Sequence, residues 1–278
     1  MYTRHWNLFE KPFELTPDPK YVYYSKAHEE ALLRLMYTVR DAKGAMLLTG
    51  GYGCGKTVLS RVFLNELVSA GRFEVALITN PRYSAKELLV EIVYQLGGDR
   101  HDYKSKGELL HLFNEIIYRN LENEKETVIV IDEAQAIEDL ETFEELRLLL
   151  NFQQNNHFLL TLILIGQPEL RARLKGLPQL KQRLVIEYHL NALDERDCAL
   201  YIDHRLRVAG AQREIFDTKA KKLIFKYSGG IPRVVNGIAD TALLVGFSEN
   251  KKNVDEPLLK RVVQNSELET AWSASSAS

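Results

Sequence analysis

One stretch decides the fold of this chain: Gly50-Gly51-Tyr52-Gly53-Cys54-Gly55-Lys56-Thr57. The residues around it predict a short buried strand over 43–49 and an amphipathic helix over 58–67, so the stretch joins a strand to a helix. A backbone that turns its N–H groups toward phosphate oxygens needs glycine where a side chain would block the approach, as at Gly50 and Gly55. The pattern therefore predicts a phosphate-binding loop for ATP or GTP, although a glycine-rich turn with a solvent-facing lysine would also fit it.

The polar residues of this loop have separate expected roles. Lys56 is expected to reach the β- and γ-phosphates of the nucleotide, and the Thr57 hydroxyl is expected to ligate Mg²⁺. The N-terminus of the following helix adds unpaired N–H donors and a partial positive charge. The predicted nucleotide-binding residues of the loop are Gly50, Gly51, Tyr52, Gly53, Cys54, Gly55, Lys56, Thr57 and Val58.

Composition indicates an ordinary globular protein that is expected to be soluble and cytoplasmic. The 278 residues are 27% charged and 45% hydrophobic, and they suggest one large domain with a smaller one. A formal charge of −2 gives no electrostatic sign of a nucleic-acid partner, although a local basic patch remains compatible with it. Only Cys54 and Cys198 are present, so a disulfide framework is not expected. The longest apolar run, 158–166, is about half of what a bilayer span needs.

The central part of the chain alternates strands with helices. Thr127-Val128-Ile129-Val130-Ile131 suits a strand buried on both faces, and a second such strand over 159–165 ends at Gly166-Gln167-Pro168. Further strands are predicted over 74–79 and 185–190, and helices from Ser25, from a capping box at Ser84 and Glu87, and over 106–121. This order predicts an α/β fold with a parallel sheet, helices on both faces, and ligands at the carboxyl ends of the strands.

The two ends of the chain differ from this pattern. Residues 1–24 are rich in aromatics and prolines and predict an ordered wrap. From Asp194 onward only helices are expected, over 195–209, 218–228, 234–247 and 258–268, which form a small all-α lid. The predicted organisation is therefore a wrap over 1–24, an α/β nucleotide-binding domain over 25–192, a helical lid over 193–268, and a disordered tail or linker over 269–278.

Five further positions are candidates for the chemistry. Asp132 is expected to hold the Mg²⁺ shell and Glu133 to deprotonate an attacking water, although the acidic residues that follow also fit a solvated helix cap. Gln167 either holds that water or senses the γ-phosphate, or it is only the N-cap of a helix opened by Pro168.

Two arginines complete the list of candidates. Arg183 is expected to act across a subunit boundary, unless it belongs to a plain basic surface with Arg171, Arg173 and Lys181. Arg233 follows Gly229-Gly230-Ile231-Pro232 at a helix start, where it would reach the γ-phosphate from the lid unless it is a surface arginine. Cys54 is interpreted as a tolerated small residue; the alternative is a thiol acidified beside Lys56.

These residues carry a resemblance to a known family. Residues 50–57, 128–133, Gln167, Arg183 and 230–233 resemble the Walker A, Walker B, sensor 1, arginine finger and sensor 2 motifs of an AAA+ ATPase. Three stretches resemble more narrowly the ExeA/GspA family, whose members serve in the assembly of type II secretion systems and related pili: Phe9–Pro19 with Ser25, His28 and Glu29; Asp132–Gln135; and Gly166–Leu170.

The resemblance implies that the wrap and the region near His28 contact adenine, and that ATP drives a ring or a helical homo-oligomer with an envelope-assembly partner. Family members that act on the cell wall carry a transmembrane helix and a peptidoglycan-binding domain that this sequence lacks. We expect the chain to be either the cytoplasmic part of a longer protein or a member of the short soluble branch used in pilus or exopolysaccharide assembly. Membrane association is therefore expected only through a partner or a missing C-terminal segment, at the cytoplasmic face of the inner membrane.

Three hypotheses for the function stay open from the sequence. The first is an AAA+ ATPase that drives envelope assembly. The second is a DNA transposition or replication ATPase, which would need a basic face that tracks DNA. The third is a scaffold that binds ATP in order to assemble and turns over hardly at all.

Overall fold

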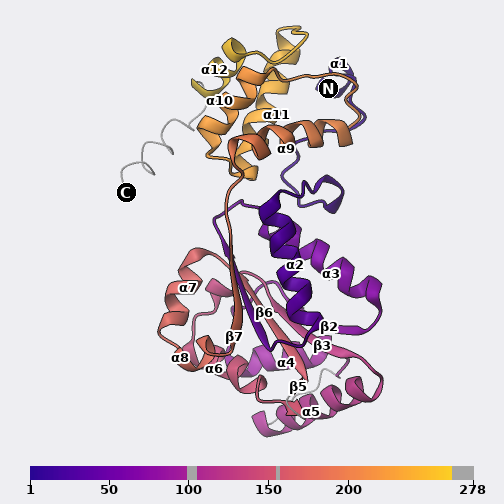
Figure 1. Cartoon of the computed structure of the whole chain (residues 1–278), viewed down its shortest axis with the longest axis vertical. Coiled ribbons are helices and arrows are strands. Elements are labelled where there is room, and N and C mark those ends of the chain that lie inside the picture. The colour runs from indigo at the N-terminus through magenta and orange to yellow at the C-terminus, as the bar shows by residue number, and fades with distance from the viewer. Residues whose placement is uncertain (99–104, 155–156, 265–278) are drawn as a thin grey trace. The chain divides into compact units, whose positions relative to one another are not determined.

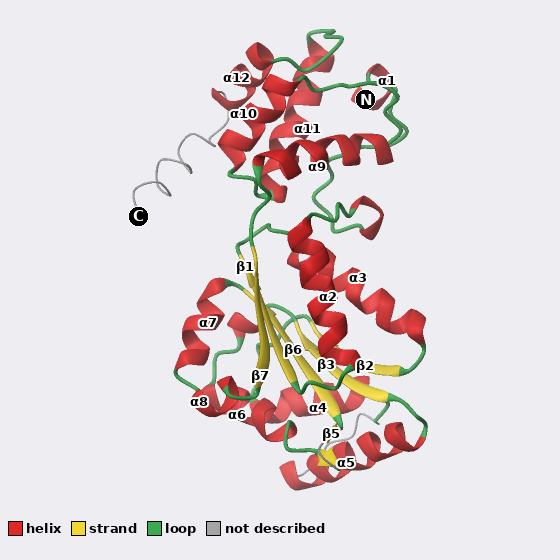
Figure 2. Ribbon diagram, in the orientation of Figure 1, coloured by secondary structure: helices red, strands yellow, loops and turns green. Residues whose placement is uncertain are grey.

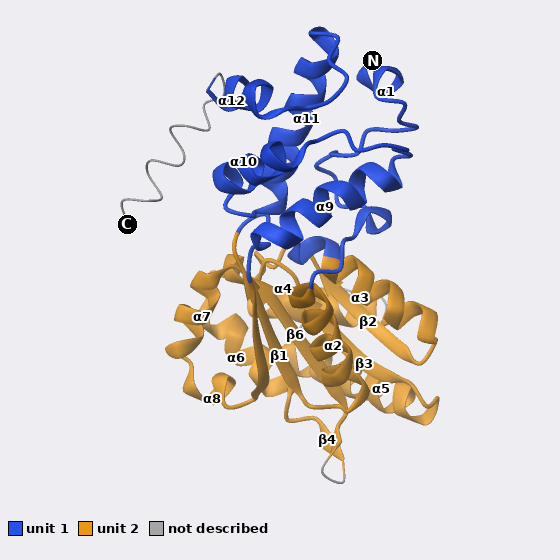
Figure 3. Ribbon diagram, turned by 45° about the horizontal axis from the view of Figure 1, so that its top comes forward, with its two compact units in different colours: residues 1–25, 52–58, 191–278 blue, residues 26–51, 59–190 orange. Residues whose placement is uncertain are grey.

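The chain forms two compact units, which Figure 3 shows in blue and orange. The computed structural model describes residues 1–98, 105–154 and 157–264. One unit, called here the helical unit, comprises 1–25, 52–58 and the chain from 191 onward. The other, the sheet unit, comprises 26–51 and 59–190. The four sequence-based segments stay predictions, and the tail over 269–278 lies outside the described residues.

The sheet unit is built on five parallel strands in the order β2-β3-β6-β1-β7. The strands are β1 Ala45–Gly50, β2 Phe73–Ile78, β3 Glu126–Ile131, β6 Leu160–Gly166 and β7 Leu184–Leu190. Every strand expected from the sequence is present with small shifts of its ends. The order places β6 between β1, which leads into the glycine-rich loop, and β3, which leads into Asp132.

Alternate residues of the central strands fill two separate cores, one on each face of the sheet. Val128 and Val130 pack with α2 Lys26–Arg40 and α3 Lys56–Ala70, while Ile129 and Ile131 belong to the core of the opposite face. Both faces are therefore covered, as a parallel sheet requires (Figures 1 and 2). The helices of the second face are α4 Ala85–Gln95, α5 Lys106–Glu122, α6 Leu140–Leu149, α7 Pro168–Lys175 and α8 Pro178–Lys181.

Several local expectations are confirmed and others need correction. The capping box of Ser84 and Glu87 at the start of α4 is present. The helix after the glycine-rich loop begins at Lys56 rather than at 58, so Lys56 and Thr57 lie in its first turn. The acidic stretch after β3 contains a helix, α6, that the sequence analysis did not predict, because Phe143 and Leu146 give it a buried face among its glutamates. A short antiparallel pair, β4 Gln153–Gln154 and β5 His157–Phe158, was also not predicted.

The helical unit contains four long helices and the N-terminal segment. The helices are α9 Glu195–Val208, α10 Thr218–Ser228, α11 Pro232–Ser248 and α12 Glu256–Gln264. The N-terminal segment, with α1 Tyr2–His5 and the 3-10 turn η1 Pro19–Tyr21, shares their core. Trp6 is 1% exposed and its Nε1 donates to the carbonyl of Leu243 at 2.9 Å. A Cβ at Gly246 would lie 2.7 Å from the Trp6 ring, so this part of α11 needs a glycine.

A buried arginine holds the N-terminal segment to α9. The Arg205 guanidinium is 6% exposed and donates to the carbonyls of Pro12 at 2.6 Å and Glu14 at 3.3 Å. It also donates to the Tyr201 hydroxyl at 2.8 Å and lies 4.7 Å from the centroid of the Tyr21 ring. The wrap predicted from the aromatics of residues 1–24 is thus fastened to the helical unit by a cation. None of the helices in the described part of the chain has the length and apolar character needed to cross a membrane.

Candidate active site

The glycine-rich loop leaves the sheet at the carboxyl end of β1, a strand that is buried along its whole length. Gly53 has φ +77° and Gly55 has φ +97°, values that side chains of L-residues rarely allow. Of the two glycines expected from the sequence to shape the loop, Gly55 has such a φ; Gly50 is the last residue of β1, and the second positive φ lies at Gly53 instead. Lys56 is 5% exposed at the first position of α3, where the helix presents N–H donors. The loop therefore has the backbone that anion binding needs.

Arg233 contacts this loop within the helical unit. Its Nη1 donates to the Tyr52 hydroxyl at 2.7 Å, and its guanidinium lies 4.9 Å from the centroid of the Tyr52 ring. Its backbone N–H donates to the carbonyl of Gly53 at 3.3 Å, and a Cβ on Gly53 would lie only 2.7 Å from the Cβ of Arg233. The sequence placed Tyr52, Gly53 and Arg233 at one predicted site from separate motifs, and the structure brings these three into contact.

The helix that carries Arg233 is fixed by the residues in front of it. Pro232 is its first residue, which suits a position whose N–H has no partner inside the helix. Gly230 has φ +73°, and a Cβ there would lie 1.9 Å from the carbonyl oxygen of Leu193, whose own N–H donates to the Gly230 carbonyl at 3.0 Å. A side chain at Gly230 is thus excluded. The Gly-Ile-Pro-Arg sequence fixes where α11 begins and so where Arg233 lies.

The acidic pair lies at the same edge of the sheet as the start of the glycine-rich loop. Asp132 follows β3, is 6% exposed, and its N–H donates to the carbonyl of Ile78 at 2.8 Å. Glu133 adopts a left-handed conformation with φ 51° and ψ 37°, which is unusual for a residue other than glycine. Its N–H donates to Asp132 Oδ1 at 2.9 Å. The chain therefore turns at Glu133, whose side chain does not continue the alternation of the strand.

Gln167 occupies the N-cap position of α7 without a hydrogen bond from its side chain to the helix. Its backbone N–H donates to Oε1 of Gln135 at 3.0 Å. The same Gln135 side chain donates through Nε2 to Oε2 of Glu133. The structure therefore connects Glu133 and Gln167 through a residue to which the sequence analysis gave no role, although Gln135 lies within the quoted Asp132–Gln135 motif.

Arg173 is not part of the plain basic surface that the sequence analysis considered. Its guanidinium donates to the carbonyls of Gln135 at 2.8 Å and Glu138 at 3.1 Å, and also to the carbonyl of Ile137. It lies 5.3 Å from the centroid of the buried Phe143 ring. Arg173, on α7, thus holds the loop that follows Glu133. No spacing in the sequence could have indicated this contact.

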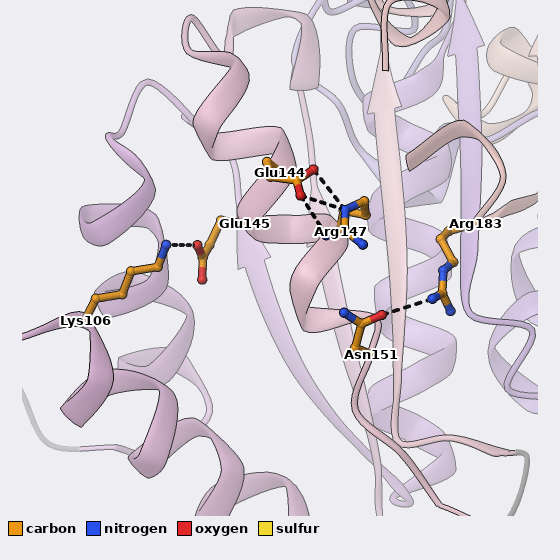
Figure 4. A network of polar contacts seen from close by, with 6 residues as sticks. All are labelled: Lys106, Glu144, Glu145, Arg147, Asn151 and Arg183. Atoms are coloured by element: carbon orange, nitrogen blue, oxygen red, sulfur yellow. Dashed lines mark hydrogen bonds and ion pairs between the residues drawn. The ribbon is translucent and has the colours of Figure 1, made fainter. Parts of the chain in front are cut away.

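Arg183 lies just beyond α8 and contacts the end of α6 (Figure 4). Its Nη2 donates to Oδ1 of Asn151 at 3.0 Å. Figure 4 also shows Glu144 bound to Arg147 on α6, and the buried Glu145 paired with Lys106 of α5. Arg183 is therefore ordered by an uncharged partner, which leaves its charge uncompensated by that contact.

Two other candidates are buried. His28, on the first turn of α2, is 7% exposed, and Cys54 is 4% exposed. Burial limits the access of a reagent to the Cys54 thiol, which favours its interpretation as a tolerated small residue. Thr57 is exposed and Val58 is partly buried.

Comparison with known proteins identifies the family. A family model described as an AAA domain matches residues 39–174. General secretion pathway protein A of Aeromonas hydrophila is 40% identical over 258 residues, which are 91% of this chain and 46% of that protein. The chain belongs to the ExeA/GspA family of AAA ATPases. It spans less than half the length of this relative.

Several solved structures share the fold of this ExeA/GspA-type chain. Drosophila ORC bound to DNA has a TM-score of 0.69 at 16% identity, and the match covers 94% of this chain and 65% of the ORC chain. The ORC2 protein of Aeropyrum pernix has a TM-score of 0.66 at 16% identity, over 92% and 71%. The RuvB branch migration motor of Thermotoga maritima has a TM-score of 0.57 at 16% identity, over 85% and 68%. At these identities the likeness shows the fold alone.

Proposed function

We propose that this chain binds ATP with Mg²⁺, hydrolyses it at the contacts between subunits, and so drives assembly of a type II secretion, pilus or related envelope complex. One observation carries the hydrolytic part of this proposal. The glycine-rich loop follows β1 and Asp132-Glu133 follow β3. Gln167 follows β6, the strand that lies between β1 and β3. Ligands of parallel sheets bind at such strand ends.

The residues present suit a nucleotide with Mg²⁺. Two left-handed glycines and a helix start at Lys56 suit a phosphate chain, and the buried Asp132 suits a cation. The described residues hold no cluster of three or more histidine, cysteine or acidic side chains that could bind a metal. In this proposal Thr57 and Asp132 would hold Mg²⁺ together with phosphate oxygens, as is usual for this ion. Bound there, Mg²⁺ would neutralise charge on the phosphates.

Each of the remaining residues has one proposed task. Lys56 binds the phosphate oxygens, and the Glu133 carboxylate accepts a proton from the attacking water. Gln167 orients that water, and Arg233 binds the γ-phosphate while it stays beside Tyr52. Arg183, supplied by a neighbouring subunit, stabilises the charge of the transition state. His28 and the wrap contact adenine.

Substitutions separate these tasks. Lys56→Ala should abolish binding of ATP, measured by equilibrium binding of a fluorescent analogue. Glu133→Gln should keep binding and nucleotide-dependent oligomers while phosphate release falls by a hundredfold or more, on the order of the loss of a general base. If Glu133→Gln changes turnover little, the chain is a nucleotide-dependent scaffold and the proposal is wrong.

The subunit-boundary role of Arg183 has its own test. Arg183→Ala and Lys56→Ala should each be inactive alone, because one lacks the arginine and the other lacks the nucleotide. An equal mixture should regain part of the activity, since Lys56→Ala subunits still offer Arg183 to neighbours that bind ATP. If the mixture stays inactive while mixed oligomers form, Arg183 does not act across the boundary.

The partner class rests on the 40% identity to a protein named for secretion. A chimera tests it, in which this chain replaces the matching segment of General secretion pathway protein A in an Aeromonas hydrophila strain that lacks the natural protein. The chimera should restore secretion and its Glu133→Gln form should not. If the chimera is folded, hydrolyses ATP and fails to restore secretion, the ATPase stands and this partner class does not.

A further inference from the structure

Gln135 joins the ends of two strands through one side chain. Its Nε2 donates to Oε2 of Glu133, beyond β3, and its Oε1 accepts the backbone N–H of Gln167, beyond β6, at 3.0 Å. A backbone N–H can only donate, so the amide oxygen must face Gln167. The amide nitrogen must then face Glu133, and the orientation of this amide follows from its partners.

This arrangement limits where the Glu133 carboxylate can lie. The left-handed backbone of Glu133 gives its side chain a direction that the strand would not. A hydrogen bond to the amide of Gln135 then fixes one carboxylate oxygen. Because the other end of that amide is held by the main chain of Gln167, the carboxylate is placed relative to β6 as well as to β3.

Two further contacts hold Gln135 itself. The carbonyl of Gln135 accepts from Arg173 Nη1 at 2.8 Å, and the same guanidinium binds the carbonyls of Ile137 and Glu138. Gly166 leaves the space for the amide, since a Cβ there would lie 2.7 Å from Oε1 of Gln135. The Glu133 carboxylate after β3, the main chain at the end of β6 and the Arg173 guanidinium of α7 thus hold Gln135 in one position.

We propose that Gln135 is a positioning residue for the hydrolysis reaction, with Arg173 and Gly166 as its supports. It places the Glu133 carboxylate in register with the end of β6, where Gln167 lies. The inference rests on the proposed function, in which Glu133 accepts the proton of the attacking water. A base that is misplaced by about 1 Å loses roughly a hundredfold in rate, so a fixed carboxylate matters even though Gln135 itself touches no reacting atom.

Two substitutions of Gln135 separate its two hydrogen bonds. Gln135→Met has a similar length and loses both. Gln135→Glu keeps an acceptor for the Gln167 N–H but loses the donor to Glu133 and adds a like charge beside it. Both should lower kcat for phosphate release by roughly 10- to 100-fold, while the Kd for ATP changes by less than about twofold. Gln153→Met, at an exposed glutamine of β4, is the matched control and should leave both values unchanged.

A double substitution tests whether Gln135 acts through Glu133. Glu133→Gln combined with Gln135→Met should be no slower than Glu133→Gln alone, because the carboxylate to be positioned is already gone. Gly166→Ala should lower kcat in the same way, since its methyl group would lie 2.7 Å from Oε1 of Gln135; it would also crowd Cδ2 of Leu170 at 2.7 Å. ATP binding serves as the check on folding for each variant.

The outcomes separate the positioning role of Gln135 from the proposed function of Glu133. If Glu133→Gln abolishes turnover and Gln135→Met and Gln135→Glu both retain wild-type kcat, the positioning role is wrong and the proposed function stands. If Gln135→Glu behaves as wild type and Gln135→Met does not, the bond to Glu133 has no role and the inference is overturned. If Glu133→Gln itself turns over normally, the proposed function fails. A loss of ATP affinity equal to the loss of kcat would assign Gln135 to structure alone and also overturn the inference.

Discussion

Arg205→Ala should detach the N-terminal segment from the helical unit. Arg205 is a buried cation that donates to neutral groups, namely the carbonyls of Pro12 and Glu14 and the Tyr201 hydroxyl. Its guanidinium also lies near the Tyr21 and Tyr201 rings, at 4.7 and 5.7 Å from their centroids. Truncation removes all of these contacts and leaves the buried oxygens without their donor.

The contacts set the expected magnitude. The two short hydrogen bonds, at 2.6 and 2.8 Å, are each worth about 1.5–3 kcal/mol because the donor is charged. The ring contacts add about 0.5–2 kcal/mol. These contributions overlap, and water can reach the carbonyl of Glu14 after truncation, so we expect a net loss of about 3–5 kcal/mol from the free energy of unfolding of the helical unit.

Arg207→Ala is the matched control for this substitution. Both arginines lie in the last turn of α9 and share the favourable interaction with its C-terminus, but Arg207 is exposed. Urea unfolding followed by Trp6 fluorescence reports on the helical unit, in a Trp272→Phe background that removes the other tryptophan. If Arg205→Ala costs less than about 1 kcal/mol more than Arg207→Ala, the guanidinium does not hold the segment and the reasoning is refuted.

Three more predictions follow from contacts in the two units. Tyr52→Phe should lower kcat/KM by roughly twofold to tenfold, because Arg233 loses a hydrogen bond but keeps its contact with the ring. Tyr52→Ala should lower kcat/KM further, because the ring is lost as well. Equal rates of phosphate release by the wild type and both variants would contradict this. Arg173→Ala should lower kcat, because Arg173 holds the loop after Glu133. Arg171 pairs with Glu187 at the surface, so Arg171→Ala should leave kcat unchanged. The reverse order would be evidence against the loop contact. Burial raises the pKa of Cys198 to about 12, and burial with the bond to Asp197 raises the pKa of Tyr23 to about 12. Both groups stay protonated in the folded state at a pH where they would ionise in the unfolded state. Their stabilisation is complete below their ordinary pKa values of 9.0 and 10.0 and is lost as the pH rises toward about 12. The free energy of unfolding reported by Trp6 should therefore fall steadily over that interval. An unchanged value would show that both groups ionise alike in the folded and unfolded states.

The parallel sheet could be predicted because its strands carry their signature locally. Val128 and Ile129 are both apolar and β-branched, so the strand must be buried on both faces, wherever the rest of the chain lies. The helices of the lid were equally evident from their caps, such as Asp217 before α10, whose carboxylate accepts the N–H of Ala220. By contrast α6 was missed, because its glutamates hid an apolar face that only packing against the sheet unit reveals.

The candidate site divides in the same way. Gly53, Lys56, Asp132 and Glu133 could be proposed from the sequence, because phosphate and metal binding would need those residue types at strand ends. Gln135 and Arg173 are not, because amides and guanidinium groups serve many purposes and nothing in their spacing names a partner.

Local patterns in the sequence were enough to propose which residues bind a nucleotide and to predict that the chain alternates strands with helices. Three contacts arise only from packing: the Gln135 amide connects Glu133 to the end of β6, Arg173 holds the loop after Glu133, and Arg205 fastens the N-terminal segment to α9. The physical reason is that burial patterns and turn residues act over a few positions, whereas a hydrogen bond between residues 38 or 193 positions apart exists only after the chain has packed.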